Sequence, residues 1–492
     1  MTNAGRGTSE SEETRESVAP PSSLATFRDA LKGSTEDLTA IPIRRAVALL
    51  AIPTVLEMSM ESVLTIVDIF VVSKLGDEAV ATVGLTEAML SPVYALAMGL
   101  SAGATAIISR RTGEKNKEGA AEAAVQVLLL TLMAAGALGI LGVALSSHLL
   151  GWMGASSGVV AQGSRYTAVM LGGSVTILLL FVVNAIFRAV GDAAAAMRSL
   201  WLANLLNIAL APCLVFGVGP FPKLGVLGAA VAMTTSRGIG VGYQLVTLIR
   251  KKELLDIGRR HLRWASGVMR EIVRIAIPAA LQVGIETASW VGLVRIVATY
   301  GSIALAGYTI AMRIVIFALL PSWGLSMAAS ALVGQNLGAK NVARARATVM
   351  TCAKYNMLFL GPISALFALA PGLPIMFFTR DAETAAVAQD CLRIVAIGFV
   401  VFAFGMVCVQ AFNGAGDTRT PMLVNLVSFW GCKLPLAWFL ASVVGLGPRG
   451  TFVAITVAYA FQGIVAFVLF RRGRWATVST SEGSARVDGA PG

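Results

Sequence analysis

The chain has 492 residues, of which 56% are hydrophobic and only 13% are charged, and its formal net charge is +12. Its mean hydropathy is +0.76. Because a soluble chain of this length carries far more charge, the composition excludes a soluble globular protein and predicts a polytopic membrane protein. We interpret the positive charge as a topology signal and a contact with anionic lipid, so no nucleic-acid partner is expected.

Apolar runs long enough to cross about 30 Å of hydrocarbon as helices recur along the chain, and they predict twelve transmembrane helices. The first six lie near residues 46–73, 79–108, 122–147, 163–189, 199–217 and 226–249. The second six lie near residues 272–299, 304–335, 347–370, 384–412, 422–443 and 450–470. The predicted fold class is an all-α membrane protein with two six-helix lobes.

The polar segments divide the chain. We predict an N-lobe over 46–249, a basic cytoplasmic linker over 250–270, a C-lobe over 271–471, and disordered cytoplasmic tails over 1–45 and 472–492. Lys and Arg gather after spans two, six, eight and twelve, so the positive-inside rule puts both termini in the cytoplasm. The N-terminal tail has no apolar core of a signal peptide. A multi-pass monomer in the bacterial plasma membrane is expected.

The two halves repeat each other. AIP at 51–53 returns at 276–278, and the same offset of 225 later pairs AIFRAVGD (185–192) with QAFNGAGD (410–417). Because each half has an even number of spans, both halves enter the membrane in the same orientation, related by a pseudo-two-fold axis along the membrane normal. Parallel repeats of this kind are typical of secondary transporters, which place a binding site between two lobes.

Three carboxylates interrupt the first apolar run, LEMSMESVLTIVDIF (56–70): Glu57, Glu61 and Asp68. At about 100° per residue they fall within roughly 40° of one another on a helix. A charge near the bilayer centre costs roughly 2.5–3.5 kcal/mol on insertion scales, so this acidic stripe must face protein or a water-filled cavity. A carboxylate there that can hold a proton or a cation is what an ion-coupled antiporter requires.

The chain resembles the multidrug and toxic compound extrusion (MATE) transporters, in their prokaryotic NorM and DinF branches. The resemblance runs from about residue 46 to 471 and is carried by the first span, by AVGDAAAAM and GAGDTRTPM, by NLLNIALAPCLVFG and LGVLGAAVA, and by the loops GEKN and GAKN. It implies that Asp68 couples transport to protons or sodium and that Pro53 bends the first helix. It also implies cation binding at Glu286, the repeat mate of Glu61.

Several positions depart from the family pattern. The fifth span keeps Asn207 but has Ala211 where DinF-like members have an Asp, and Phe402 stands at the tenth-helix Asp of the NorM pattern. We therefore expect a shifted coupling site built on Glu61, Asp68 and Asn207. For Glu57 a coupling role and a helix-packing hydrogen bond stay equally open.

Met and aromatic residues in several spans predict a wide apolar cavity, because thioethers and aromatic rings can pack against ligands of many shapes. The residues predicted to line it are Met60, Met89, Trp290, Phe317 and Trp323. Aromatic rings beside carboxylates favour lipophilic cations as substrates. Intramembrane arginines, Arg188 and Arg237 among them, are interpreted as structural.

The sequence lacks motifs for nucleotide binding and for paired cysteines. No GxxxxGK[ST] motif occurs in the sequence, so transport is expected to use an ion gradient, with Na+ or H+ as the coupling ion and no cofactor. The five cysteines form no CxxC pair, and a sodium ion at Asp68 or Glu286 is the one metal expected. Two alternatives stay open: a flippase or exporter of lipid-linked or anionic metabolites, and a membrane enzyme, which the two distant histidines do not favour.

Overall fold

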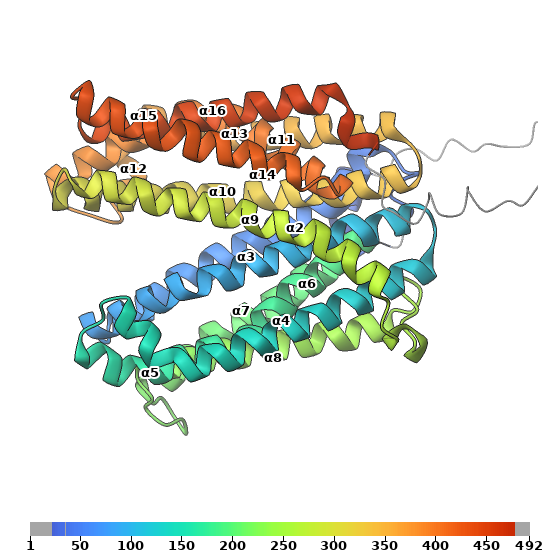
Figure 1. The fold of residues 1–492 in the computed structure, drawn as a ribbon, viewed down its shortest axis with the longest axis horizontal. Coiled ribbons are helices and arrows are strands. Elements are labelled where there is room, and N and C mark those ends of the chain that lie inside the picture. The colour runs from blue at the N-terminus through green and yellow to red at the C-terminus, as the bar shows by residue number, and fades with distance from the viewer. Residues whose placement is uncertain (1–21, 35, 478–492) are drawn as a thin grey trace, which may run out of the picture.

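The computed structural model describes residues 22–34 and 36–477, and within these ranges the regular elements are all helical. Figure 1 shows two bundles lying side by side. The N-lobe holds α2 (Ile43–Ser73), α3 (Asp77–Gly113), α4 (Lys117–Trp152), α5 (Ser157–Gly172), α6 (Ser174–Val190), α7 (Ala193–Phe216) and α8 (Val226–Arg250). The C-lobe holds α9 (Ser266–Ala298), α10 (Ser302–Gly338), α11 (Val342–Leu369), α12 (Gly372–Ile375), α13 (Ala382–Ala415), α14 (Arg419–Asn425), η2 (Leu426–Lys433), α15 (Leu434–Trp438), η3 (Phe439–Val443) and α16 (Pro448–Arg472).

These elements make six membrane crossings in each lobe, which confirms the predicted fold class. The α5–α6 pair forms one crossing, Ser157–Val190, and Arg419–Val443 forms another. Nine crossings of the described chain are long and apolar enough by composition alone. The other three, α2, α8 and α9, carry polar side chains in mid-helix, such as Glu57, Arg237 and Glu286. The polar side chains of these three helices face protein and not lipid. The helices can therefore be less apolar than a helix surrounded by lipid.

The duplication is visible in backbone details. Lys115 and Lys340, one offset apart, both adopt a positive φ (60° and 57°) in the loop after the second helix of their lobe. The next residues, Asn116 and Asn341, cap the following helix by accepting a hydrogen bond from a backbone amide (2.8 and 2.9 Å). A side-chain cap of this kind typically contributes about 1 kcal/mol to the stability of a helix.

The lobes meet along two equivalent seams. A Cβ built on Gly99 of α3 would lie 2.5 Å from the carbonyl oxygen of Ala276 in α9, and one on Gly324 of α10 would lie 2.6 Å from that of Thr54 in α2. Gly99 and Gly324 are repeat mates, so the same sequence position closes both seams. Small residues permit such close approach of helices in a membrane. In Figure 1 the lobes touch at the right of the view and diverge at the left, where α5 and α12 lie.

We expect Gly324→Ala to weaken the contact between the lobes, because its methyl group would collide with the backbone of α2. Gly136→Ala on α4 is the matched control: its Cβ would meet nothing within 4 Å, so only the gain of about 1 kcal/mol in helix propensity remains. Thermal unfolding of the purified variants should show Gly324→Ala less stable than wild type and Gly136→Ala unchanged or more stable. Equal stability of the two variants would contradict the tight seam.

Both predicted tails differ from the expectation of disorder over 1–45 and 472–492. Ser23–Lys32 forms helix α1, capped by the Ser22 side chain, and Arg45 holds it by pairing with Asp29 (3.1 Å) and Glu36. At the other end Arg474–Thr477 forms η4, in which Trp475 is fully buried on Phe470. Local ion pairs and ring stacking order these segments. Residues 1–21 and 478–492 of the predicted tails lie outside the described residues.

The N-terminal segment bridges the two lobes at the end where they touch. Arg344 of α11 donates to the carbonyl oxygens of Leu38 (2.9 Å) and Ile41, and Arg198 of α7 donates to that of Lys32 (3.0 Å). One short stretch before α2 is thus bound by an arginine from each lobe.

Candidate functional site

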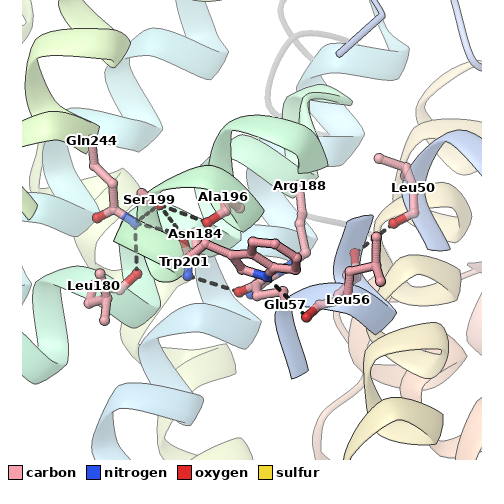
Figure 2. Close-up of polar contacts among 11 residues, drawn as sticks. Leu50, Leu56, Glu57, Leu180, Asn184, Arg188, Ala196, Ser199, Trp201 and Gln244 are labelled. Carbon is pink, nitrogen blue, oxygen red and sulfur yellow. Dashed lines mark hydrogen bonds and ion pairs between the residues drawn. The ribbon is translucent and has the colours of Figure 1, made fainter. Parts of the chain in front are cut away.

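The first carboxylate of the stripe lies in a buried ion pair. Glu57 Oε1 accepts hydrogen bonds from Arg188 Nη1 (2.9 Å) and Asn184 Nδ2 (2.9 Å), and Oε2 lies 3.1 Å from the same Arg188 nitrogen (Figure 2). The Glu57 and Arg188 side chains are 1% and 3% exposed. A buried carboxylate is tolerated only when paired and hydrogen-bonded, and both conditions hold here.

The pair belongs to a larger polar network. The Asn184 side-chain oxygen accepts from Gln244 Nε2 (2.5 Å) and Ser199 Oγ (3.3 Å), and Gln244 also reaches Ser199 Oγ (3.0 Å), as Figure 2 shows. The members come from α2, α6, α7 and α8. This network ties four N-lobe helices together, so of the two readings left open for Glu57 the structure favours the packing contact.

The second carboxylate is loosely paired. Glu61 Oε2 accepts a hydrogen bond from Asn204 Nδ2 (3.0 Å), and its Oε1 lies 3.8 Å from Arg237 Nη2. Arg237, whose partner the sequence did not reveal, also lies 3.4 Å from the Tyr94 hydroxyl. Glu61 therefore has a positive neighbour but no short ion pair.

The third carboxylate has no ion pair. Asp68 Oδ1 accepts a hydrogen bond from Asn207 Nδ2 (3.0 Å), and no Lys, Arg or His nitrogen in the described chain lies within 4.0 Å of Asp68. The side-chain oxygen of Asn207 is buried and has no hydrogen-bond partner within those residues. The structure thus brings the predicted Asp68 and Asn207 together, and the amide oxygen beside them has no hydrogen-bond partner among the described residues. Pro53, predicted to bend the helix, lies inside the continuous α2.

Asn207→Ala should reduce ion-coupled transport severalfold, because it removes both the donor to Asp68 and the unsatisfied oxygen beside it. Leu205→Ala on the same helix is the control, since its side chain is exposed and touches neither group. Gradient-driven uptake into membrane vesicles measures both. Undiminished uptake by Asn207→Ala would contradict a coupling site that includes this residue.

The C-lobe contains a cavity of about 350 Å³. Helices α9, α10, α13 and α16 supply most of its wall, and α3 and α6 of the N-lobe close it. Its aromatic lining is ordered by contacts within the wall: Trp290 Nε1 donates to the Tyr308 hydroxyl (2.7 Å), and Tyr459 stacks on Phe402 with ring centroids 4.1 Å apart. The size and composition suit a small organic ligand.

The cavity lining differs from the predicted one. Trp290 and Trp323 line it, as predicted, whereas Met60, Met89 and Phe317 do not. Met60 lies on α2, and no residue of α2 is part of the cavity lining. Sequence position alone could not show which face of a helix meets a neighbour.

Two charged groups line this cavity. Glu286 is exposed to it, and no hydrogen-bond donor within the described residues reaches its carboxylate. Lys433, the last residue of the π-helical segment η2, is only 4% exposed; its Nζ donates to Ser289 Oγ (2.8 Å) and lies 4.4 Å from the centroid of the Phe429 ring. Glu286 is a cation-binding residue predicted from the sequence, and Lys433 is not among the predicted site residues.

Trp201 and Trp430 make similar contacts in the two lobes. Trp201 Nε1 donates to the Leu56 carbonyl and Trp430 Nε1 to the Ile285 carbonyl, each 145 residues earlier. Asn204 and Lys433 each follow their tryptophan by three residues. The two tryptophans lie 229 residues apart, four more than the repeat offset, so the offset of 225 pairs Asn204 with Phe429 and not with Lys433.

The described residues contain no group of three or more His, Cys, Asp and Glu side chains that could hold a metal ion. A site for a single alkali cation needs oxygen ligands, and Asp68 with the free oxygen of Asn207 offers them. Glu286 offers a carboxylate with a lysine nearby. Sodium at either residue stays a prediction.

Comparison with known proteins agrees with this architecture. The MatE family model matches residues 53–213 and 278–439. The probable multidrug resistance protein NorM of Thermotoga maritima is 26% identical over 435 residues, 88% of this chain and 93% of that protein. The FAD transporter of Shewanella oneidensis is 25% identical over 440 residues, 88% and 96% of the two chains.

A crystal structure of MATE in the straight conformation superimposes with a TM-score of 0.84 at 27% identity, covering 89% of this chain and 98% of that one. The two ranges matched by the family model begin 225 residues apart, at the offset of the internal repeat. The chain therefore belongs to the MATE family of membrane transporters, in its prokaryotic NorM-like branch.

Proposed function

We propose that the protein is a secondary antiporter that exports lipophilic organic compounds, cations among them, in exchange for protons or sodium. The observation that carries the proposal is Asp68, the one carboxylate of the acidic stripe without an ion pair in the described chain. A charged group inside a membrane protein is expensive and is retained where it serves transport. Asp68 either takes up a proton or binds a cation together with the Asn207 oxygen.

Substrate and ion use different lobes in this proposal. The aromatic cavity lies in the C-lobe, and Asp68 lies on α2 of the N-lobe. The two lobes contact each other through α2 and α10 and through α3 and α9. A change in charge at Asp68 that alters how α2 packs would therefore change the seam on which the cavity depends, which is the coupling that alternating access requires.

The orientation is part of the proposal. Basic residues follow α3 and α10 in the sequence, among them Lys115 and Arg344, and Figure 1 shows both helices ending on the side where the lobes touch. Basic loops favour the cytoplasmic side, so both termini would be cytoplasmic and the lobes would diverge outward, in the inner membrane of a bacterium. We propose a monomer, with a small organic molecule and the lipid bilayer as partners and no cofactor.

The test is uptake of ethidium into inverted vesicles under an imposed proton gradient and, separately, an imposed sodium gradient. Uptake driven by one gradient identifies the coupling ion. Uptake that ignores both gradients would contradict antiport.

A second candidate is export of an anionic aromatic metabolite. Lys433 and Arg188 both line the cavity, and one relative is named an FAD transporter. Flavin uptake measured in the same vesicles distinguishes the candidates: flavin transported without ethidium would favour the anionic substrate.

A further inference from the structure

The charges around the C-lobe cavity cancel. Three charged side chains line it: Glu286, Lys433 and Arg188. The positive charge of Arg188 is compensated by Glu57, with which it forms the buried ion pair. That leaves one negative and one positive group on the cavity wall, and their charges act on each other.

The two remaining groups are placed differently. Their nitrogen and oxygen atoms form no ion pair within 4.0 Å, and the Lys433 ammonium is occupied by Ser289 Oγ and the Phe429 ring. Lys433 is almost fully buried, whereas Glu286 faces the cavity. A ligand thus meets the carboxylate directly and feels the ammonium as a fixed charge beneath the wall.

The repeat mate of Glu286 has a different set of neighbours. Glu61 accepts a hydrogen bond from the neutral Asn204 of α7. Its positive neighbour, Arg237, comes from α8. The carboxylate in the C-lobe therefore differs from its repeat mate in having a lysine, from the segment η2, as its positive neighbour.

We propose that Lys433 is a built-in counter-cation for Glu286, which makes the C-lobe cavity electrically neutral and lets it bind aromatic ligands of zero net charge, zwitterions included, as well as monovalent cations. This rests on the proposed function, because it names the ligand class of the same cavity. Without Lys433 the uncompensated carboxylate of Glu286 would make the cavity prefer an aromatic cation to a neutral aromatic ligand. Lys433 determines which ligand charge the cavity prefers. It acts on the ligand electrostatically and makes no direct contact with it.

The experiment uses the purified full-length protein in detergent and two probes that share a triphenylphosphorus group: tetraphenylphosphonium, a monovalent cation, and triphenylphosphine oxide, which is neutral. Equilibrium dialysis needs no ion gradient, so a failure of antiport and a failure of this inference give separate results. Protein-free detergent corrects for partition into micelles. For wild type we expect the two probes to bind with affinities within about threefold of each other, because the net field is near zero.

Lys433→Met removes the charge and keeps the length of the side chain. It should raise the affinity for tetraphenylphosphonium about tenfold, because unit charges several Å apart interact appreciably at a protein-like dielectric. The neutral probe should be unaffected. Glu286→Gln should lower the affinity for the cation about tenfold, and the double variant should return near wild type. Lys433→Arg, which keeps the charge, is the control and should behave as wild type.

Three results would overturn the proposal. One is a Lys433→Met protein that binds both probes more tightly by the same factor, which would indicate a change in packing. Another is wild type that prefers the cation more than tenfold, which would mean that Glu286 is not compensated. The third is wild type that binds neither probe, which would remove the cavity as a ligand site. If Lys433→Met does not fold, the proposal is still tested by the ratio of the two probe affinities in wild type and by the loss of cation affinity in Glu286→Gln.

Discussion

Asp68→Asn should abolish gradient-driven uptake of ethidium, lowering it at least about tenfold, because an amide neither exchanges a proton nor supplies a negative charge for a cation. The substitution keeps the size of the side chain and one oxygen toward Asn207. Binding of tetraphenylphosphonium to the purified variant should stay as in wild type, since Asp68 does not line the cavity. This combination of lost coupling and retained binding separates the ion site from the ligand site.

Asp77→Asn is the control for that experiment. Asp77 is an exposed carboxylate at the first turn of α3, outside the acidic stripe. Its removal changes the total charge by the same amount but should leave uptake unaffected. An Asp68→Asn variant that still responds fully to the gradient would show that another group, with Glu61 as the first candidate, carries the coupling ion.

Arg188→Met should be more destabilising than removal of any other charge in the acidic stripe or the cavity wall. It leaves Glu57 buried with Asn184 as its remaining partner, and removal of one member of a buried ion pair typically costs about 3–5 kcal/mol. The double variant Glu57→Leu with Arg188→Met should recover most of that loss, because no unpaired charge remains. Thermal unfolding of the purified proteins in detergent, followed by circular dichroism, measures both.

The control is an exposed pair with similar atoms. Arg449 lies 2.7 Å from Asp390 and its side chain is 67% exposed, so Arg449→Met should cost no more than about 1 kcal/mol. Comparable losses for Arg188→Met and Arg449→Met would mean that the N-lobe network contributes little to stability.

Hydropathy and the repeat predicted the fold well because a bilayer leaves few alternatives for a helical chain. The predicted span 46–73 became α2, Ile43–Ser73, and the span 304–335 became α10, Ser302–Gly338. Helix α1 was missed because its order depends on Arg45 pairing with Asp29 and Glu36, a contact between segments that hydropathy does not record.

The candidate site was predictable only in part. The family resemblance brought Asp68 and Asn207 into one predicted site, and the structure places Asn207 Nδ2 3.0 Å from Asp68 Oδ1, while their role in coupling stays a prediction. Lys433 was missed, because the constant offset of 225 pairs Asn204 with Phe429 and not with Lys433. The partner of Glu57 was hidden for another reason: 131 residues separate it from Arg188, and nothing in either segment marks the pair.

The two seams between the lobes have a consequence for the origin of the molecule. Helix α3 packs on α9 at one seam, and their repeat mates α10 and α2 pack together at the other, so one interface is used twice. This is the arrangement of an isologous dimer, whose protomers here have become joined through the chain between α8 and α9. A true homodimer would carry the same residue at both copies of each position. Fusion removed that constraint, so repeat mates such as Glu57 and Gln282 could become different residues, and the two halves are free to take on different tasks.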